Sequence, residues 1–320
     1  MRNLFIIVIL LSQWQVNAQT IGTNQAIEDL EFLRKSIIEY NPALSKYHPE
    51  FDSLSIQVIE KPHYETVSIL EHFTKINKIC ALANEGHINI GDRNDNFYKE
   101  ISDNTKISLP IQIKIIDSRI YIYGDFSNEQ LLNRGDEVIT INGISSKNIL
   151  NKLMEVTSSD GNIKTYAFRK IEDTFSSIFY YHIQQCDVFT IKTLDKDNKE
   201  KSTTLKALTT RGKIDNIKKY YPPKDVQKNE AESFYTLTLN SDYAYLKLPS
   251  FDYRKVNKYQ VKSKKLYKSI FEELQNENVN HLIIDLRDNT GGRNEFADDI
   301  IPFIIQDDNN DSFLKKTISW

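Results

Sequence analysis

Apolar residues in the N-terminal part of the chain recur at helical spacing. The stretch "NQAIEDLEFLRKSIIEY" carries an apolar stripe and ends before Asn41-Pro42, where a proline disfavours further helix. Its members are Ile27, Leu30, Ile37 and Ile38. A second stretch, "YETVSILEHFTKINKICALA", repeats the stripe, and Gly86 follows it as a stop signal. The pattern predicts a helical region over residues 19–95.

The middle of the chain changes to a period of two. "LPIQIKIIDSRIYIYGD" alternates apolar and polar residues on both sides of Asp117-Ser118, which predicts a strand hairpin. A strand at Glu137–Ile141, a tight turn at Asn142-Gly143 and a helix from Ser146 to about Val156 are expected next. Further strands are predicted at "CDVFTIKTL" and "KSTTLKAL", and no element is assigned between that helix and the first of them. Residues 96–208 are therefore expected to form a β-rich domain.

The C-terminal part mixes the two periods. Residues 209–232 are polar, contain Pro222-Pro223 and are interpreted as a linker. From residue 233 to residue 320, strands at "SFYTLTL", "YAYLKLPSF" and "HLIIDLR" are separated by a helix at "VKSKKLYKSIFEELQ", and a helix at "NEFADDIIPFII" follows. The predicted fold class is α/β, an α+β multidomain chain whose last domain has a parallel or mixed sheet.

The first 18 residues differ from the rest. Arg2 precedes the apolar run "LFIIVILL", and small residues lead to a cleavage point after Ala18, as in an export signal. A membrane span needs about 20 apolar residues, and Ser12 and Gln13 interrupt this run too early. The mature protein is therefore expected to be periplasmic or extracellular, with no integral membrane segment.

Composition excludes several classes of partner. The chain is 40% hydrophobic and 27% charged with a net charge of −3, a balance that attracts neither nucleic acid nor anionic membrane. Cys80 and Cys186 either pair or stay as buried thiols, and the sequence leaves both alternatives open. Five histidines have no metal-ligand spacing to acidic or cysteine partners, so neither a metal nor a cofactor is expected; they are His48, His63, His72, His182 and His281.

Two places in the chain could carry chemistry. In "DLRDNTGG", which follows a predicted buried strand, two glycines let the backbone approach a ligand and the next helix offers free N–H groups. A plain tight turn is the alternative for Gly291 and Gly292, and the spacing of neither phosphate-binding glycine motif is present. His87 lies between a helix end and a short strand, where a capping or core histidine is the alternative to a catalytic one.

Taken in order along the chain, these segments resemble the tail-specific, or C-terminal-processing, serine peptidase family, in particular its tricorn-like branch. "ANEGHINIG" is similar to the family's Asp-Gly-His-Thr segment, and "LLNRGDEVITINGISSKNIL" resembles half of a PDZ-like domain. "YAYLKLPSF" and "LIIDLRDNTGG" resemble parts of the catalytic core, which in this family is crotonase-like. The similarity extends from about Ile27 to Phe303.

The resemblance implies roles for individual residues. His87 would be the general base, and the backbone amides of Gly291 and Gly292 would form the oxyanion hole. The side chains of Asp285, Arg287 and Asn289 would hold the corner in shape. The PDZ-like domain would dock a protein or peptide substrate by strand addition.

The chain departs from the family's pattern in three ways. The acidic residue expected to orient the base, later in the family's sequence than the nucleophile, is not found in this sequence. Glu85 and Ile88 stand where the family has Asp and Thr. The nucleophilic serine is expected on a later strand-helix elbow, and the segments around Ser312 and Ser319 do not have that pattern, so no nucleophile is assigned and the catalytic core is expected to be incomplete. The resemblance thus implies an exported serine-type endopeptidase present as a shortened chain. A catalytically inactive peptide-binding module is the alternative, and a small-ligand or phosphate-binding protein is the remote one.

Overall fold

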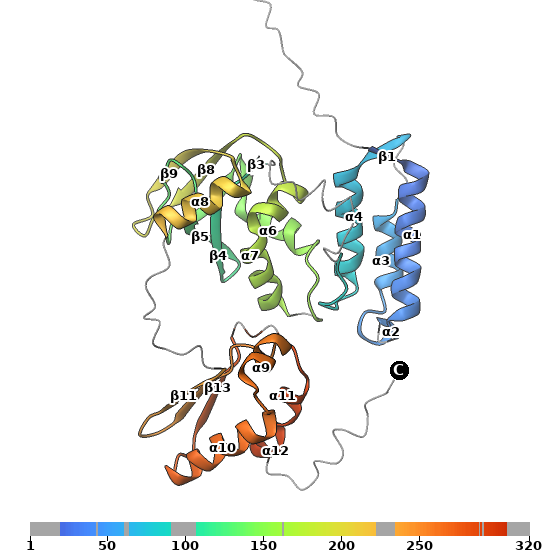
Figure 1. Ribbon diagram of the computed structural model, residues 1–320. Coiled ribbons are helices and arrows are strands. Elements are labelled where there is room, and N and C mark those ends of the chain that lie inside the picture. Colours follow the sequence, from blue (N-terminus) through green and yellow to red (C-terminus); the bar gives the residue numbers. More distant parts are fainter. Residues whose placement is uncertain are drawn as a thin grey trace, which may run out of the picture. The chain divides into compact units, whose positions relative to one another are not determined.

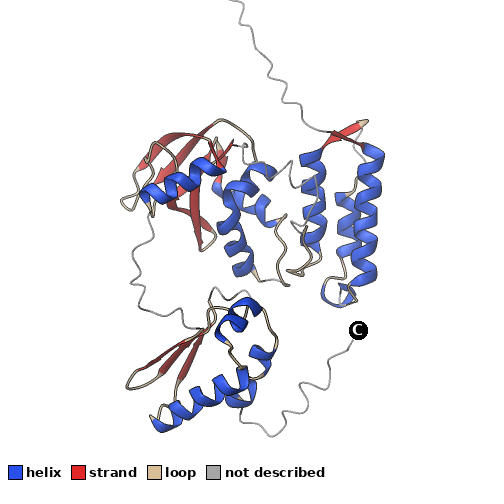
Figure 2. Cartoon of the chain, viewed as in Figure 1, coloured by secondary structure: helices blue, strands red, loops and turns tan. Residues whose placement is uncertain are grey.

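The computed structural model describes residues 20–42, 44–60, 64–90, 107–161, 163–221, 234–287, 289 and 291–305. It divides into two compact units, Met1–Pro222 and Pro223–Trp320, which are described separately below (Figures 1 and 2). The predicted export signal lies outside the described residues. The predicted boundary near residue 95 does too, and the helical and β-rich parts on either side of it belong to the same unit.

The helical part of the first unit is built from α1 (Thr23–Tyr40), α3 (Phe51–Val58) and α4 (Ile69–Leu82), with the short α2 (Leu44–Tyr47) between α1 and α3. Two short strands, β1 (Thr20–Gly22) and β2 (Thr66–Ser68), pair antiparallel. The helices pack through the predicted stripes, since Leu30 and Ile37 are buried in their common core and Ile76 and Leu82 pack against it. The stripe was wrong at one position, because Ile38 is 41% exposed.

The β-rich part is a six-stranded sheet in the order β4-β5-β6-β8-β9, with β7 paired to β6. The strands are β4 (Ile111–Ile116), β5 (Arg119–Asp125), β6 (Glu137–Ile141), β7 (Ile144–Ser145), β8 (Val188–Leu194) and β9 (Glu200–Lys206). All pairings are antiparallel. The predicted hairpin is confirmed, and its turn residues Asp117 and Ser118 both have positive φ. One face of the sheet packs on α6 (Ser146–Met154) and α7 (Lys164–His182).

Two helices occupy segments for which the sequence analysis has none. α7 buries Ala167, Ile171, Phe175 and Phe179, which recur every four residues and line one face of a helix. The segment assigned to a linker contains α8 (Thr210–Tyr220), capped by the Thr209 hydroxyl and preceded by β10 (Leu208–Thr209), which pairs with β3 (Ile107–Ser108). The described part of the predicted linker is therefore ordered structure.

The second unit is a three-stranded mixed sheet with helices. β11 (Thr236–Leu239) pairs antiparallel with β12 (Ala244–Lys247), which pairs parallel with β13 (Leu282–Asp285). The connection between the two parallel strands contains α9 (Tyr253–Tyr259) and α10 (Ser263–Asn276), as parallel pairing requires a long crossover. The helix predicted after β13 is two shorter ones, α11 (Glu295–Asp298) and α12 (Ile301–Ile304). The α/β class is confirmed, with several sheets in one chain.

Two expectations about the whole chain can be compared with the structure. Cys80 and Cys186 are both free, so they do not form a disulfide. Burial raises the pKa of the Cys80 thiol to about 11. None of the helices in the described ranges is long and apolar enough to cross a membrane.

Candidate active site

His87 lies in a loop that begins where α4 ends. Ser68 caps the start of this helix by accepting a hydrogen bond from the Glu71 amide at 3.1 Å. The helix ends at Leu82, and Asn84 then takes a left-handed conformation with φ of 50°, which asparagine tolerates better than most residues. The chain thereby turns away from the helix axis and presents Glu85 to Asn89 as a loop.

A second segment, which follows α6, fixes this loop on both sides of His87. The Gly86 amide donates to Asp160 Oδ1 at 2.6 Å, and the Ser158 hydroxyl donates to the Ile88 carbonyl at 2.6 Å. The Gly161 amide donates to the Asn84 carbonyl at 2.8 Å. Gly86 has no room for a larger residue without displacement, because a Cβ there would lie 3.1 Å from Asp160 Oδ1. The backbone position of His87 is therefore set by tertiary contacts.

The side chain of His87 is 93% exposed and pairs with the carboxylate of Glu85. Glu85 Oε1 lies 2.7 Å from His87 Nδ1 and also accepts the His87 backbone amide at 3.0 Å. The sequence analysis assigned no role to Glu85 beyond noting that the family has Asp there. Its spacing of two residues from His87 was the only signal in the sequence.

The second candidate region is the corner that follows β13. Asp285 is 5% exposed and accepts hydrogen bonds from the Arg287 side chain at 2.8 and 2.9 Å, from the Arg287 amide at 2.9 Å, and from the Tyr245 hydroxyl. These bonds, those from the Arg287 side chain foremost, hold the pKa of Asp285 well below its usual range. The same contacts raise the pKa of Arg287. The pair stays charged and fixes the exit of the strand.

Asn289 continues the support of the corner. Its Nδ2 donates to the Leu248 carbonyl at 2.8 Å, and its Oδ1 accepts the Gly291 amide at 2.8 Å. Asp285, Arg287 and Asn289 thus lie around the glycine corner, and their role of holding it in shape for a reaction stays a prediction.

Gly291 and Gly292 have backbone conformations that suit glycine, with φ of 84° and 140°. The Phe251 amide donates to the Gly291 carbonyl at 3.2 Å, and the Arg293 amide donates to the Phe251 carbonyl at 2.9 Å. This parallel bridge brings the two chain segments so close that a Cβ on Gly292 would lie 2.1 Å from the Phe251 carbonyl oxygen. Only glycine fits at Gly292 without a backbone shift.

The two glycine amides differ in availability. The Gly291 amide is bound to Asn289, as described above. In a parallel bridge the N–H of the paired residue points away from the partner segment, so the Gly292 amide faces away from Phe251. No described residue accepts a hydrogen bond from it. In this conformation the corner therefore offers one amide, from Gly292, where the sequence analysis expected two.

The predicted site residues are divided between the two units. His87 belongs to the first unit, and the corner from Asp285 to Gly292 belongs to the second, so each half of the site is described by itself. Ser312 and Ser319 lie in residues 306–320, outside the described residues. The nucleophile therefore stays a matter of prediction.

One group of side chains near His87 could in principle hold a metal ion. Within the described ranges, potential ligand atoms of Glu85, His87 and Asp160 lie within 4.8 Å of one another. His87 and Asp160 are exposed, and the carboxylate oxygens already accept hydrogen bonds from the loop. We assign no ion to this group, and the expected absence of a metal stays a prediction.

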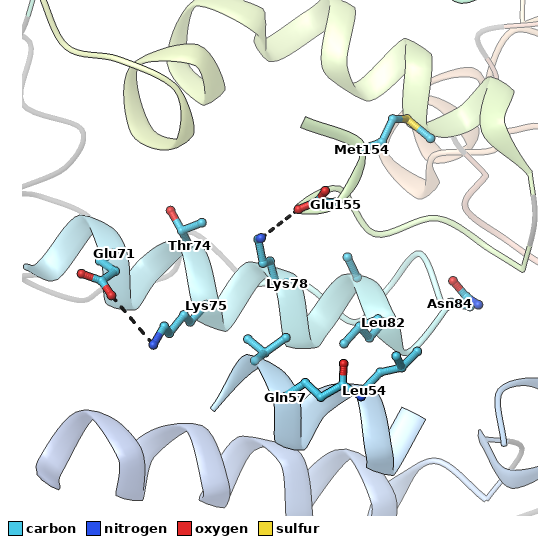
Figure 3. A pocket seen from close by; sticks show the side chains of 12 residues that line it. Leu54, Gln57, Glu71, Thr74, Lys75, Lys78, Leu82, Asn84, Met154 and Glu155 are labelled. Atoms are coloured by element: carbon cyan, nitrogen blue, oxygen red, sulfur yellow. Dashed lines mark ion pairs between the residues drawn. The ribbon is translucent and has the colours of Figure 1, made fainter. Parts of the chain in front are cut away.

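A groove adjoins the loop that carries His87. It has a volume of about 850 Å³, and its lining includes apolar side chains of α3 and α4 together with Met154 and Asn84, the residue before Glu85 (Figure 3). Lys78 reaches across it to Glu155 at 2.8 Å (Figure 3). The sequence analysis did not predict this groove, because it depends on Met154 and Glu155 lying beside α4 in the fold.

Comparison with protein-family models gave a match that lies in the second unit. The model of Peptidase family S41 matches residues 242–317, which include the corner but make up less than half of the chain. A search of curated proteins found no match.

Among solved structures, mature CPAF complexed with lactacystin matches with a TM-score of 0.54 and 14% identity over 86% of this chain. A second structure, the crystal structure of mature CPAF, matches with a TM-score of 0.52 and 14% identity over 85% of this chain. A CPAF mutant with a serine replaced by alanine gives 0.54 and 14% over 85%. This chain spans 58%, 56% and 57% of those chains, respectively. At this identity the matches establish a similarity of fold.

Proposed function

We propose that this chain carries the general base and an oxyanion-stabilising amide of an exported serine-type peptidase of the tail-specific kind, which cleaves extended or C-terminal segments of proteins. The observation that carries the proposal is the corner at Gly292. It lies within the region matched by Peptidase family S41, it is shaped by a steric requirement for glycine, and its amide is turned away from the Phe251 segment. A preorganised donor of this kind stabilises the oxyanion formed when a peptide carbonyl is attacked.

His87 supports the same reaction class. Its ring is exposed to an incoming substrate, its backbone is fixed by the segment after α6, and its Nδ1 is held by a carboxylate. These are the features of a general base that takes a proton from a serine hydroxyl through Nε2. The tricorn-like branch, the export signal at residues 1–18 and the PDZ-like nature of the β-rich part belong to the proposal.

Substrate docking by strand addition would use an edge of the six-stranded sheet. At β4, one edge strand, the Ile115 amide already donates to Glu172 Oε1 of α7 at 2.6 Å. A peptide added along β4 would therefore have to compete with a buried carboxylate. Binding of a labelled extended peptide should tighten in Glu172→Ala if β4 is the docking edge.

The test is a peptidase assay on the natural gene product. Its intact mass shows whether the natural chain extends beyond Trp320 and whether the N-terminus begins after Ala18. We expect it to cleave unfolded casein and to be labelled by a serine-directed fluorophosphonate. His87→Ala should lower kcat by about 10³-fold or more, with an unchanged unfolding midpoint, because members of a catalytic triad act as a unit.

His281→Ala provides the matched control, since it removes another exposed histidine. Equal losses in the two variants would refute a specific role for His87. Intact casein together with an absence of probe labelling would refute the peptidase proposal. Peptide binding without cleavage would then favour the inactive peptide-binding module.

A further inference from the structure

The loop at the end of α4 contains a carboxylate placed to orient the histidine two residues later. Glu85 Oε1 accepts hydrogen bonds from both the amide and the Nδ1 of His87, at 3.0 and 2.7 Å. A carboxylate accepts hydrogen bonds and donates none, so this contact requires the proton on Nδ1. In the neutral ring, Nε2 then carries the lone pair, which is the form that a general base needs.

The geometry of the pair is set by more than the two side chains. The three hydrogen bonds from residues 158–161 hold the backbone at Asn84, Gly86 and Ile88. Glu85 and His87 alternate with these anchored positions, so their Cα atoms are fixed relative to each other. The carboxylate therefore needs only its own side-chain torsions to reach Nδ1, which lowers the entropic cost of the contact.

We propose that Glu85 is the positioning residue for His87, an inference that rests on the proposed peptidase function. As the serine oxygen attacks the peptide carbonyl carbon, its O–H bond breaks and an Nε2–H bond forms on His87. The imidazolium so formed keeps its Nδ1–H bond to Glu85, whose negative charge stabilises it. Asp160 has a different role, since its carboxylate holds the Gly86 backbone.

Exposure makes this proposal easy to separate from a structural role. Glu85 and His87 side chains are 36% and 93% exposed, and exposed pairs of this kind add little to stability. Substitution of Glu85 should therefore leave the unfolding midpoint unchanged. Any change seen in the state of the imidazole or in turnover then reports on positioning.

The first experiment reads the tautomer directly. Long-range proton–nitrogen correlation spectra of the full chain with ¹⁵N-labelled histidine, recorded where the imidazoles are neutral, should show His87 protonated at Nδ1. The peak is assigned by its loss in His87→Asn. Glu85→Ala should convert it to the tautomer mixture of free histidine, whereas Glu71→Ala, which removes an exposed carboxylate of α4, should not. A tautomer mixture in the unaltered chain would overturn the proposal.

The second experiment uses turnover of casein-derived peptides by the natural gene product. Glu85→Ala should lower kcat by about 10²-fold with KM nearly unchanged, because the interaction strengthens in the transition state. Glu85→Gln keeps an accepting oxygen without the charge, so it should fall between Ala and Glu. Full activity of Glu85→Ala would overturn the positioning role. A correct tautomer in a chain that cleaves nothing would instead refute the peptidase function and leave the hydrogen bond standing.

Discussion

Acidification is expected to weaken the packing of α4 against α7, because a half-buried histidine lies between them. His182, the last residue of α7, stacks on Phe73 with ring centroids 5.4 Å apart. Its Nδ1 lies 2.9 Å from the Thr74 hydroxyl, which itself donates to the Leu70 carbonyl at 2.8 Å, so Nδ1 is the donor in the first contact. Burial, aided by the charge of Lys78, lowers the pKa of His182 to about 4.

The size of this loss of stability follows from the proton affinity of His182 in the folded and in the unfolded chain. The unfolded chain takes up a proton at this histidine near pH 6.5, and the folded chain does so only near pH 4. Between these values the unfolded state binds more protons, so stability falls as the pH falls. Each tenfold difference in affinity corresponds to about 1.4 kcal/mol, which gives a loss of about 2 kcal/mol between pH 7 and about pH 4.5. The loss approaches about 3 kcal/mol at lower pH.

The assay is urea unfolding followed by far-ultraviolet circular dichroism at both pH values, on the full chain and on His182→Asn. The asparagine keeps an N–H donor for Thr74 and cannot titrate. The difference between the two proteins isolates His182 from other titrating groups, among them His72, whose pKa burial also lowers. We expect the unaltered chain to lose about 2 kcal/mol more than His182→Asn. Equal losses in the two proteins would refute the reasoning.

Three further outcomes are expected. Gly292→Ala should destabilise the second unit by about 2–4 kcal/mol, because its Cβ would overlap the backbone of the Phe251 segment. Gly291→Ala has open space around its Cβ and should cost about 1–2 kcal/mol. Equal unfolding midpoints for the two variants would contradict this reasoning. Glu172→Gln should cost about 2–3 kcal/mol in urea unfolding, since the 1%-exposed carboxylate is paired with two cations, and an unchanged midpoint would show that the pairs contribute nothing. In the native chain, a disulfide reagent near pH 8 should modify Cys186 much faster than Cys80, because burial keeps the Cys80 thiol protonated. The fast phase of the reaction should therefore come from Cys186 and should remain in Cys80→Ser.

Much of the fold could be predicted from local patterns. The stripes of α1 and α4, the hairpin around Asp117 and the alternating elements of the second unit were read correctly, since apolar periodicity reports directly which face of an element is buried. α7 shows the same signal in the four-residue recurrence from Ala167 to Phe179, but the sequence analysis did not assign it. α8 was taken for a linker because its sequence is strongly polar and is followed by Pro222-Pro223, and its start is set by the Thr209 cap.

The sequence by itself identified His87 and the corner from Asp285 to Gly292 as places where chemistry could occur, because residue type and proximity to element ends are local properties. Only the tertiary structure revealed that Asp160 anchors the His87 loop, that Glu85 holds the imidazole, and that the Gly292 amide, rather than both glycine amides, is turned outward. These depend on contacts such as the one between Gly86 and Asp160, 74 residues apart, and on the backbone of one segment approaching another. Hydrogen-bond geometry at that range is fixed by packing, which no local pattern encodes.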